Sequence, residues 1–236
     1  MDDMVGKTIC IIPARENSKR IKEKNIIDFD GEPMISWTIK AALKSNIFDR
    51  IVVSTDSKKI ADITCSYGIE VPFLRDGLAD DFTPISEVTI SALNQASSYW
   101  KENYETVVQL MANCPNRNAN DIKGAFNYFN KQGLDSLISC SSTHNIVPWW
   151  SLTIDKNKEP NYNFPKLLNK RSQDLDDTYV LSGALWIAKS SKLIKYNTFY
   201  LPNHRVYPLD WISAIDIDTH DDLRIAKIAR AFSREK

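Results

Sequence analysis

Short apolar segments alternate with amphipathic segments of helical periodicity along most of this 236-residue chain. Such alternation is typical of βαβ units, so it predicts an α/β fold with a mostly parallel, twisted sheet flanked by helices. With 43% hydrophobic residues the chain can bury a sizeable core, and we predict one domain spanning residues 1–236. Strands are expected at 8–12, 50–54, 106–111, 136–140, 183–188 and 214–217.

Five helices are expected between these strands and after the last of them. Their ranges are 33–44, 58–67, a segment opening at Thr83-Pro84, 120–131 and a segment opening at Thr219. Thr83 suits an N-cap followed by proline at the first helical position. In the last helix we expect Leu223, Ala226 and Phe232 to contact the core.

The alternation fails between residues 141 and 179, where the chain is polar, aromatic and rich in turn residues. This stretch predicts a small inserted lobe that serves as an oligomerisation arm. Its pair Trp149-Trp150 would stack on a sugar or on a partner subunit, or would simply pack within the lobe.

Charge and cysteine usage exclude several classes of protein. Thirty basic and thirty acidic residues cancel, so no global field favours nucleic acid or a membrane surface. The four cysteines are widely spaced and predict neither a disulfide framework nor a zinc site. The apolar run near the N-terminus is too short for a signal peptide or a spanning helix, so we expect a cytoplasmic protein.

The first apolar strand leads into a loop that holds five cations between residues 15 and 24. Arg15, Lys19 and Lys24 offer charge-assisted donors, Ser18 a hydroxyl and Asn25 an amide, all suited to phosphate oxygens. No glycine lies between Gly6 and Gly31, so neither Walker nor dinucleotide-binding glycine motifs are present. The loop predicts a polyphosphate site built from side chains, although charge alone also fits a solvated loop.

The same loop resembles a known family signature. Its pattern Pro13-Ala14-Arg15-x-x-Ser18-Lys19 followed by Lys24-Asn25 is similar to that of CMP-sialic acid synthetases, the acylneuraminate cytidylyltransferases. Further similarity follows in order at residues 48–56, 73–81, 182–184 and 215–219. The resemblance implies a Rossmann-like nucleotidyltransferase fold with an inserted dimerisation lobe.

Asp216 and Asp218 form a D-x-D pair at the end of the expected last strand. Alternate residues of a strand share a face, so both carboxylates could reach one hard cation. Taken alone, such a pair also fits ordinary strand-end or helix-cap aspartates. The resemblance makes both residues metal ligands and implies Mg²⁺ as the cofactor.

The chemistry implied by the resemblance is attack of a nonulosonic acid's anomeric hydroxyl on the α-phosphate of CTP, giving a CMP-sugar and pyrophosphate. Cations in the site would neutralise charge on the phosphate oxygens and the leaving group. The implied catalytic residues are Arg15, Lys19, Lys24 and Asp218. The implied nucleotide-binding residues are Ala14, Arg15, Ser18, Asn25, Arg75 and Asp81.

Sugar contacts are assigned to Asn113, Arg171 and Ser182, of which Arg171 suits a carboxylate through a bidentate pair. Two departures from the family pattern leave the sugar open. Residues 111–117 read Met-Ala-Asn-Cys-Pro-Asn-Arg in place of Gln-Pro-Thr-Ser-Pro, and residues 180–184 lack the family's arginine. A legionaminic or pseudaminic acid therefore joins N-acetylneuraminate as a possible substrate.

Alternative functions stay open on the sequence alone. They are a 3-deoxy-octulosonate cytidylyltransferase, a D-x-D glycosyltransferase and a non-catalytic nucleotide-sugar binding protein. In the resembled family the inserted lobe reaches a neighbouring subunit, which implies a homodimer. CTP and a nonulosonic acid are the implied small-molecule partners.

Overall fold

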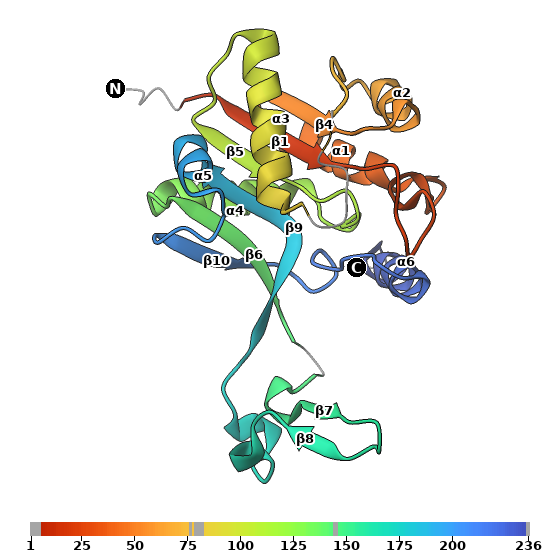
Figure 1. Cartoon of the computed structure of the whole chain (residues 1–236), viewed down its shortest axis with the longest axis vertical. Coiled ribbons are helices and arrows are strands. Elements are labelled where there is room, and N and C mark those ends of the chain that lie inside the picture. The colour runs from red at the N-terminus through yellow and green to blue at the C-terminus, as the bar shows by residue number, and fades with distance from the viewer. Residues whose placement is uncertain (1–5, 76, 78–82, 144–145, 235–236) are drawn as a thin grey trace.

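Six strands of the computed structural model form one sheet, in the spatial order β10-β6-β9-β5-β1-β4 (Figure 1). The structure describes residues 6–75, 77, 83–143 and 146–234. The strands of this sheet are β1 (Thr8–Pro13), β4 (Arg50–Ser54), β5 (Thr106–Gln109), β6 (Ser136–Ser142), β9 (Tyr179–Lys189) and β10 (His204–Pro208). A short hairpin of β2 (Asp28–Phe29) and β3 (Glu32–Pro33) follows the first loop.

The sheet is mostly parallel, which confirms the predicted fold class. Strand β1 pairs in parallel with both β4 and β5, and β10 pairs in parallel with β6. Strand β9 lies antiparallel between β5 and β6. Because β1 pairs with β4 on one side and β5 on the other, the loops after these strands diverge at its carboxyl end, where α/β proteins bind ligands.

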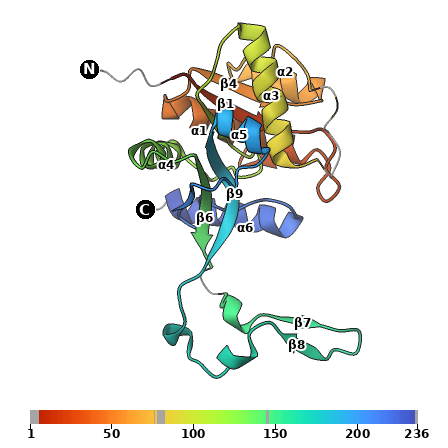
Figure 2. The ribbon, with the colours of Figure 1, turned by 60° about the vertical axis from the view of Figure 1, so that its left-hand side comes forward.

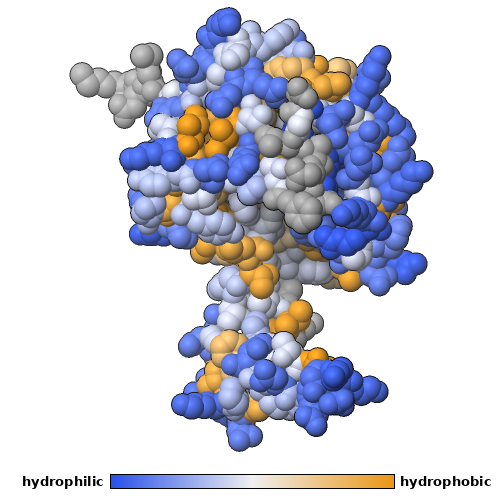
Figure 3. Space-filling model, in the orientation of Figure 1, coloured by the Kyte–Doolittle hydropathy of each residue, from blue (hydrophilic) through white to orange (hydrophobic). Residues whose placement is uncertain are grey.

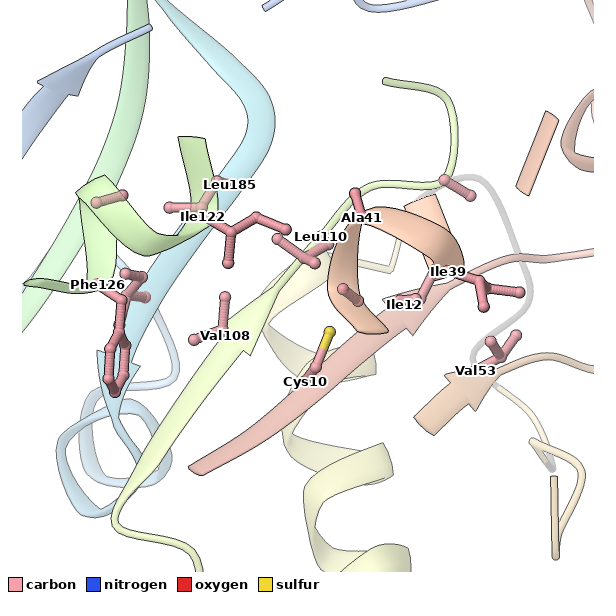
Figure 4. Close-up of a cluster of buried hydrophobic side chains, with 14 of the residues drawn as sticks. Cys10, Ile12, Ile39, Ala41, Val53, Val108, Leu110, Ile122, Phe126 and Leu185 are labelled. Atoms are coloured by element: carbon pink, nitrogen blue, oxygen red, sulfur yellow. The ribbon is translucent and has the colours of Figure 1, made fainter. Parts of the chain in front are cut away.

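Helices cover both faces of the sheet. The described residues form α1 (Met34–Ser45), α2 (Lys58–Ser66), α3 (Ile85–Trp100), α4 (Ala119–Lys131), α5 (Ser190–Tyr196) and α6 (His220–Arg234). Alternate residues of β1 point to opposite faces. Cys10 and Ile12 pack with α1 and α4 side chains such as Ile39 and Phe126, as Figure 4 shows. Ile9 and Ile11 pack with α3 and α5 on the other face.

A lobe (residues 143–178) leaves the body between β6 and β9 (Figures 1 and 2). It contains the antiparallel hairpin of β7 (Leu152–Ile154) and β8 (Pro160–Tyr162) and short 3-10 helices. Trp149 packs edge-on against Phe164 and donates its indole N–H to the Asp176 carbonyl. None of the buried hydrophobic residues of the described chain lies in the lobe.

Two local expectations were wrong, and one strand was not predicted. Residues 214–217 form no strand, because the N–H groups of Ala214 and Ile215 bond within a local turn and that of Ile217 bonds to the loop after β5. The sixth strand is instead β10, a half-exposed edge strand whose sequence gives no regular apolar alternation. Phe232 is 52% exposed and is not a core residue, whereas Ala226 is buried.

The start of α3 also differs from the expectation by one position. Pro84, with extended backbone geometry, is the N-cap residue and the helix begins at Ile85. Thr83 therefore precedes the cap. None of the helices in the described ranges is long and apolar enough to span a bilayer.

Candidate active site

A cavity of about 630 Å³ lies at the carboxyl ends of β1 and β5. It brings together the first loop, the segment after β5 and the segment before α6. Nine of the residues predicted for the site line it: Arg15, Ser18, Lys19, Lys24, Asn25, Arg75, Asn113, Asp216 and Asp218.

Four of the five cations of the first loop line this cavity. After the buried β1, the loop ends in a 3-10 helix that begins at Lys24. The Lys24 ammonium lies 2.7 Å from Asp218 Oδ1, and Arg20 Nη2 lies 2.8 Å from Asp218 Oδ2. The buried Asn25 donates its amide to the Arg15 carbonyl at 2.9 Å, which fixes the two ends of the loop to each other. The basic loop therefore contacts Asp218 directly, and both aspartates line the same cavity.

The twin aspartates are held by the loop after β5, not by a strand. Ile217 donates its N–H to the Asn113 carbonyl at 2.9 Å, and the Asn113 amide donates to the Asp216 carboxylate and to the Ile217 carbonyl. On the other side, Asp222 accepts the backbone N–H groups of Asp218 and Thr219. Both carboxylates therefore line the cavity although the segment is irregular.

The two aspartates have opposite electrostatic environments. Burial by the surrounding protein raises the pKa of Asp216 to about 6, and the charge of Asp218 adds to that rise, although Asp216 keeps an exposed face toward the cavity. Partial burial also acts to raise the pKa of Asp218. The hydrogen bonds and charges of Lys24 and Arg20 outweigh it, so this pKa lies below its usual value.

Arg75 is a buried cation in the cavity wall. Its side chain is 4% exposed, and neither Nε nor Nη2 has a hydrogen-bond partner among the described residues. Burial lowers its pKa, Asp56 opposes this, and Arg15 lowers it further. A buried guanidinium with unused donors at a cavity is suited to a polar ligand.

The charge balance of the cavity favours a polyphosphate. Its described lining contains five basic residues and two aspartates, an excess of three positive charges. A second cavity of about 340 Å³ lies in the lobe and beside it, and its described lining includes Asp176 and Asp177 but no lysine or arginine. The larger cavity is therefore the candidate phosphate site.

The donor set fits Mg²⁺ when a nucleotide supplies further ligands. The described residues contain no group of three or more histidine, cysteine or acidic residues that could hold a metal by themselves. Magnesium is commonly bound through one or two carboxylates together with substrate phosphates and water. Asp216 and Asp218 supply two such carboxylates. Near them, the buried Asn113 Oδ1 has no hydrogen-bond partner in the described structure.

Three other predicted residues do not line the cavity in this chain. Ala14 is buried and donates its N–H to the Ser54 carbonyl, so it sets the loop's starting point. Ser182 is buried in β9 and donates its hydroxyl to the Ala214 carbonyl, which ties the sheet to the aspartate segment. Arg171 lies in the lobe and forms a two-pronged pair with Asp174. Asp81 lies outside the described residues.

Some residues of the cavity wall were not predicted as site residues. Arg20 was counted among the loop cations, but nothing in its spacing distinguished it as a partner of Asp218. Thr83, Ile85 and Val88 also line the cavity, and their residue types give no functional signal.

A mostly parallel sheet with a basic loop and paired carboxylates at its carboxyl edge defines an α/β nucleotide-binding protein. Comparison with known proteins makes the class specific. The profile of the family described as cytidylyltransferase matches residues 9–209. The chain is 34% identical over 230 residues to a pseudaminic acid cytidylyltransferase of Campylobacter jejuni, covering 97% of this chain and 98% of that protein.

Two further proteins agree with this match. A CMP-N,N'-diacetyllegionaminic acid synthase of Legionella pneumophila is 33% identical, and the match covers 97% of this chain and 98% of that protein. Among solved structures, a CMP:2-keto-3-deoxy-manno-octonic acid synthetase complexed with CTP has a TM-score of 0.69 at 15% identity, covering 98% of this chain and 100% of that chain. The chain therefore belongs to the cytidylyltransferase family and is a nucleotidyltransferase, as the resemblance implied.

Proposed function

We propose that this protein activates a nonulosonic acid with CTP, giving the CMP-sugar and pyrophosphate. The observation that carries the proposal is that the basic loop and the twin aspartates line one cavity, in which Lys24 lies 2.7 Å from Asp218. The names of the relatives support the reaction: one is a pseudaminic acid cytidylyltransferase and another a CMP-N,N'-diacetyllegionaminic acid synthase.

The chain's own residues divide into phosphate and base contacts. Arg15, Lys19 and Lys24 would neutralise the charge that grows on the phosphate oxygens and the leaving pyrophosphate, a role in which one donor is worth about 3 to 4 kcal/mol. Ser18 and Asn25 lie on the same loop. Arg75 would direct its unused donors to the cytosine, where a guanidinium can pair with ring acceptors. We assign Asp81 to the same nucleotide-binding region on the resemblance alone.

Asp216 and Asp218 would hold Mg²⁺. When bound there, the ion would supply positive charge to the triphosphate and favour the ionised form of the attacking hydroxyl. Both oxygens of Asp218 contact cations in the free protein. Lys24 and Arg20 would thus shift from the carboxylate to phosphate oxygens as the nucleotide enters, leaving the aspartate to the ion.

The sugar acid would occupy the end of the cavity near Asn113. This residue lines the cavity and orders Asp216 through its amide, so its proposed sugar contact is combined with a role in holding the carboxylate. The nonulosonic class follows from the relatives; which member is used stays open, with pseudaminic and legionaminic acids as the first candidates.

We further propose a homodimer in which the lobe is covered by the partner subunit. The lobe holds no buried hydrophobic residue among those described, and Ile146 and Ile154 are 72% and 66% exposed. Figure 3 shows apolar surface around the junction of lobe and body, where Tyr179, Val180 and Leu181 are each at least 50% exposed. Contiguous exposed apolar surface marks an interaction site. Arg171 would then reach a sugar carboxylate in the partner's cavity.

The test is incubation of the protein with CTP, Mg²⁺ and a panel of nonulosonic acids, with the products identified by mass. Pyrophosphate release that requires the sugar acid separates a synthetase from a glycosyltransferase or a binding protein, neither of which cleaves CTP. A 3-deoxy-octulosonate arm tests the neighbouring activity of the structural relative. Since the cytoplasm supplies CTP, we place the reaction there.

A further inference from the structure

Asp56 follows β4 in the Ser-Thr-Asp motif at 54–56, to which the proposed chemistry assigns no role. Its Oδ1 accepts the backbone N–H of Glu16 at 2.9 Å. The same oxygen lies 3.8 Å from Nη2 of Arg75. One carboxylate oxygen thus faces both the start of the phosphate loop and the buried arginine of the cavity wall.

Arg75 needs a compensating charge. Its guanidinium is almost fully buried, and the nearby Arg15 repels it. A buried cation without a counter-ion is strongly unfavourable. Among the residues that the structure describes, Asp56 supplies the carboxylate within ion-pair distance of Arg75, and its side chain is 21% exposed. At 3.8 Å the pair is longer than a hydrogen bond, so the carboxylate balances the charge and leaves the donors of Arg75 available to a ligand.

Ser57, which directly follows Asp56, forms a second contact with Glu16. The buried Ser57 donates its hydroxyl to Glu16 Oε1 at 3.1 Å. Glu16 directly follows Arg15, which lines the cavity. The segment after β4 therefore fixes the first turn of the loop from both the backbone and the side chain of Glu16.

We propose that Asp56 is a positioning residue for nucleotide binding: it holds buried Arg75 and the start of the phosphate loop in one fixed arrangement, so that base and phosphate contacts are made together. This inference rests on the proposed function. Asp56 itself is not expected to touch the nucleotide.

Binding of CTP, measured by calorimetry without sugar acid, tests the role. Asp56→Asn keeps the shape and an oxygen that can accept the Glu16 N–H but removes the charge that faces Arg75. We expect it to raise the dissociation constant for CTP about tenfold, the usual size for a lost interaction with a charged group. In an Arg75→Ala background, Asp56→Asn should raise the dissociation constant for CTP by less than about twofold, because the guanidinium that Asp56 faces is absent. Asp62→Asn, at an exposed carboxylate on α2, is the matched control and should change neither value.

Equal losses in the two backgrounds, or no loss in either, would overturn the positioning role. Melting temperatures of the Asp56→Asn and Asp62→Asn proteins show whether the fold is kept, and Asp56→Glu, which retains the charge, should bind CTP more tightly than Asp56→Asn. Absence of CTP binding by the unaltered protein would overturn the proposed function and this inference with it. CTP binding that Asp56→Asn leaves intact overturns this inference alone.

Discussion

The cavity in the body and the lobe differ in how their polar groups are held. In the cavity, Lys24 meets Asp218 across 194 positions of sequence, and buried strands and loops fix both. In the lobe, Arg171 pairs with Asp174 three positions away, and both side chains are exposed. The body's charges are arranged before any ligand arrives, whereas the lobe's are organised only by their immediate neighbours.

This difference indicates a division of labour. A site that is already formed in one chain can bind a nucleotide alone, because little ordering has to accompany binding. A lobe whose two strands consist of exposed residues needs another surface, since an isolated two-stranded hairpin is marginally stable in water. We therefore expect changes in the body to affect CTP handling and changes in the lobe to affect assembly and sugar handling.

The largest effect is expected from Lys24→Ala. Removing this cation takes away a charge directed at the phosphates, so turnover should fall at least about a hundredfold with the fold preserved. Asp218→Asn, which removes the carboxylate that pairs with Lys24, should lower turnover by a similar factor. Pyrophosphate release measures both.

Matched controls for these variants lie close by in the chain. Lys22→Ala changes an exposed cation of the same loop, and Asp221→Asn changes an exposed carboxylate at the start of α6. Both should leave turnover within about twofold, as surface charges away from a site usually do. Folded Lys24→Ala protein with near-normal pyrophosphate release would remove Lys24 from the proposed machinery.

Replacing the lobe tests the other half of the comparison. Ser142 and Tyr179 are opposite one another in the β6 and β9 pairing, so an Asn-Gly turn can join them in place of residues 143–178. The shortened protein should be a monomer by light scattering and should bind CTP within about threefold of the intact chain, because the cavity is built from the body. Its turnover should fall by at least about tenfold if the lobe supplies a sugar contact.

Two results would break this division. A shortened protein that stays dimeric would show that the body carries the interface, and one that turns over normally would exclude Arg171 from the sugar site. Arg171→Ala in the intact chain separates assembly from contact. It should raise the KM for the sugar acid while the KM for CTP and the dimer are kept.

The sequence predicted the parts of the site that depend on strand order. An apolar run such as Ile9–Ile12 identifies a buried strand, and the carboxyl end of a buried parallel strand identifies the loop with Lys24 as a ligand site. The resemblance predicted Asp216 and Asp218 as site residues, whereas the strand expected to carry them does not form. What fixes them is the Asn113 amide and the Asp222 carboxylate, contacts between segments that no local pattern encodes.

Other features depended on tertiary packing and could not be predicted. The resemblance assigns Arg75 to the nucleotide, but its burial follows only from the fold. The bond from the Ser182 hydroxyl to the Ala214 carbonyl likewise joins segments that no local pattern connects. The edge strand β10 consists of partly or well exposed residues, so its sequence shows no regular apolar alternation. Hydrophobic periodicity indicates which residues are buried, so it does not identify a strand or a site that is half exposed.

The titration of Asp216 should test the electrostatic environment of the cavity. Its pKa of about 6 lies above the ordinary value of 3.8, so the carboxyl is neutral below pH 6 and charged above it. Because the folded state holds this proton more tightly than the unfolded chain, the group disfavours folding progressively as the pH rises from 3.8 to about 6. Carboxyl carbon NMR of the metal-free protein should show this midpoint. Asp218→Asn should lower it, because the like charge is removed while Lys24 and Arg20 remain.

The smallest effect is expected from Gly183→Ala in the motif at 182–184. A Cβ at this position of β9 would lie 3.2 Å from Cγ of Met111, a side chain that lines the cavity. Methionine is flexible, so it should yield by moving toward the cavity, and turnover should fall by about two- to fivefold without loss of the fold. In a Met111→Ala background the contact is absent, and Gly183→Ala should then be neutral. An equal loss in both backgrounds would mean that Gly183 acts through the backbone of β9 and not through the cavity wall.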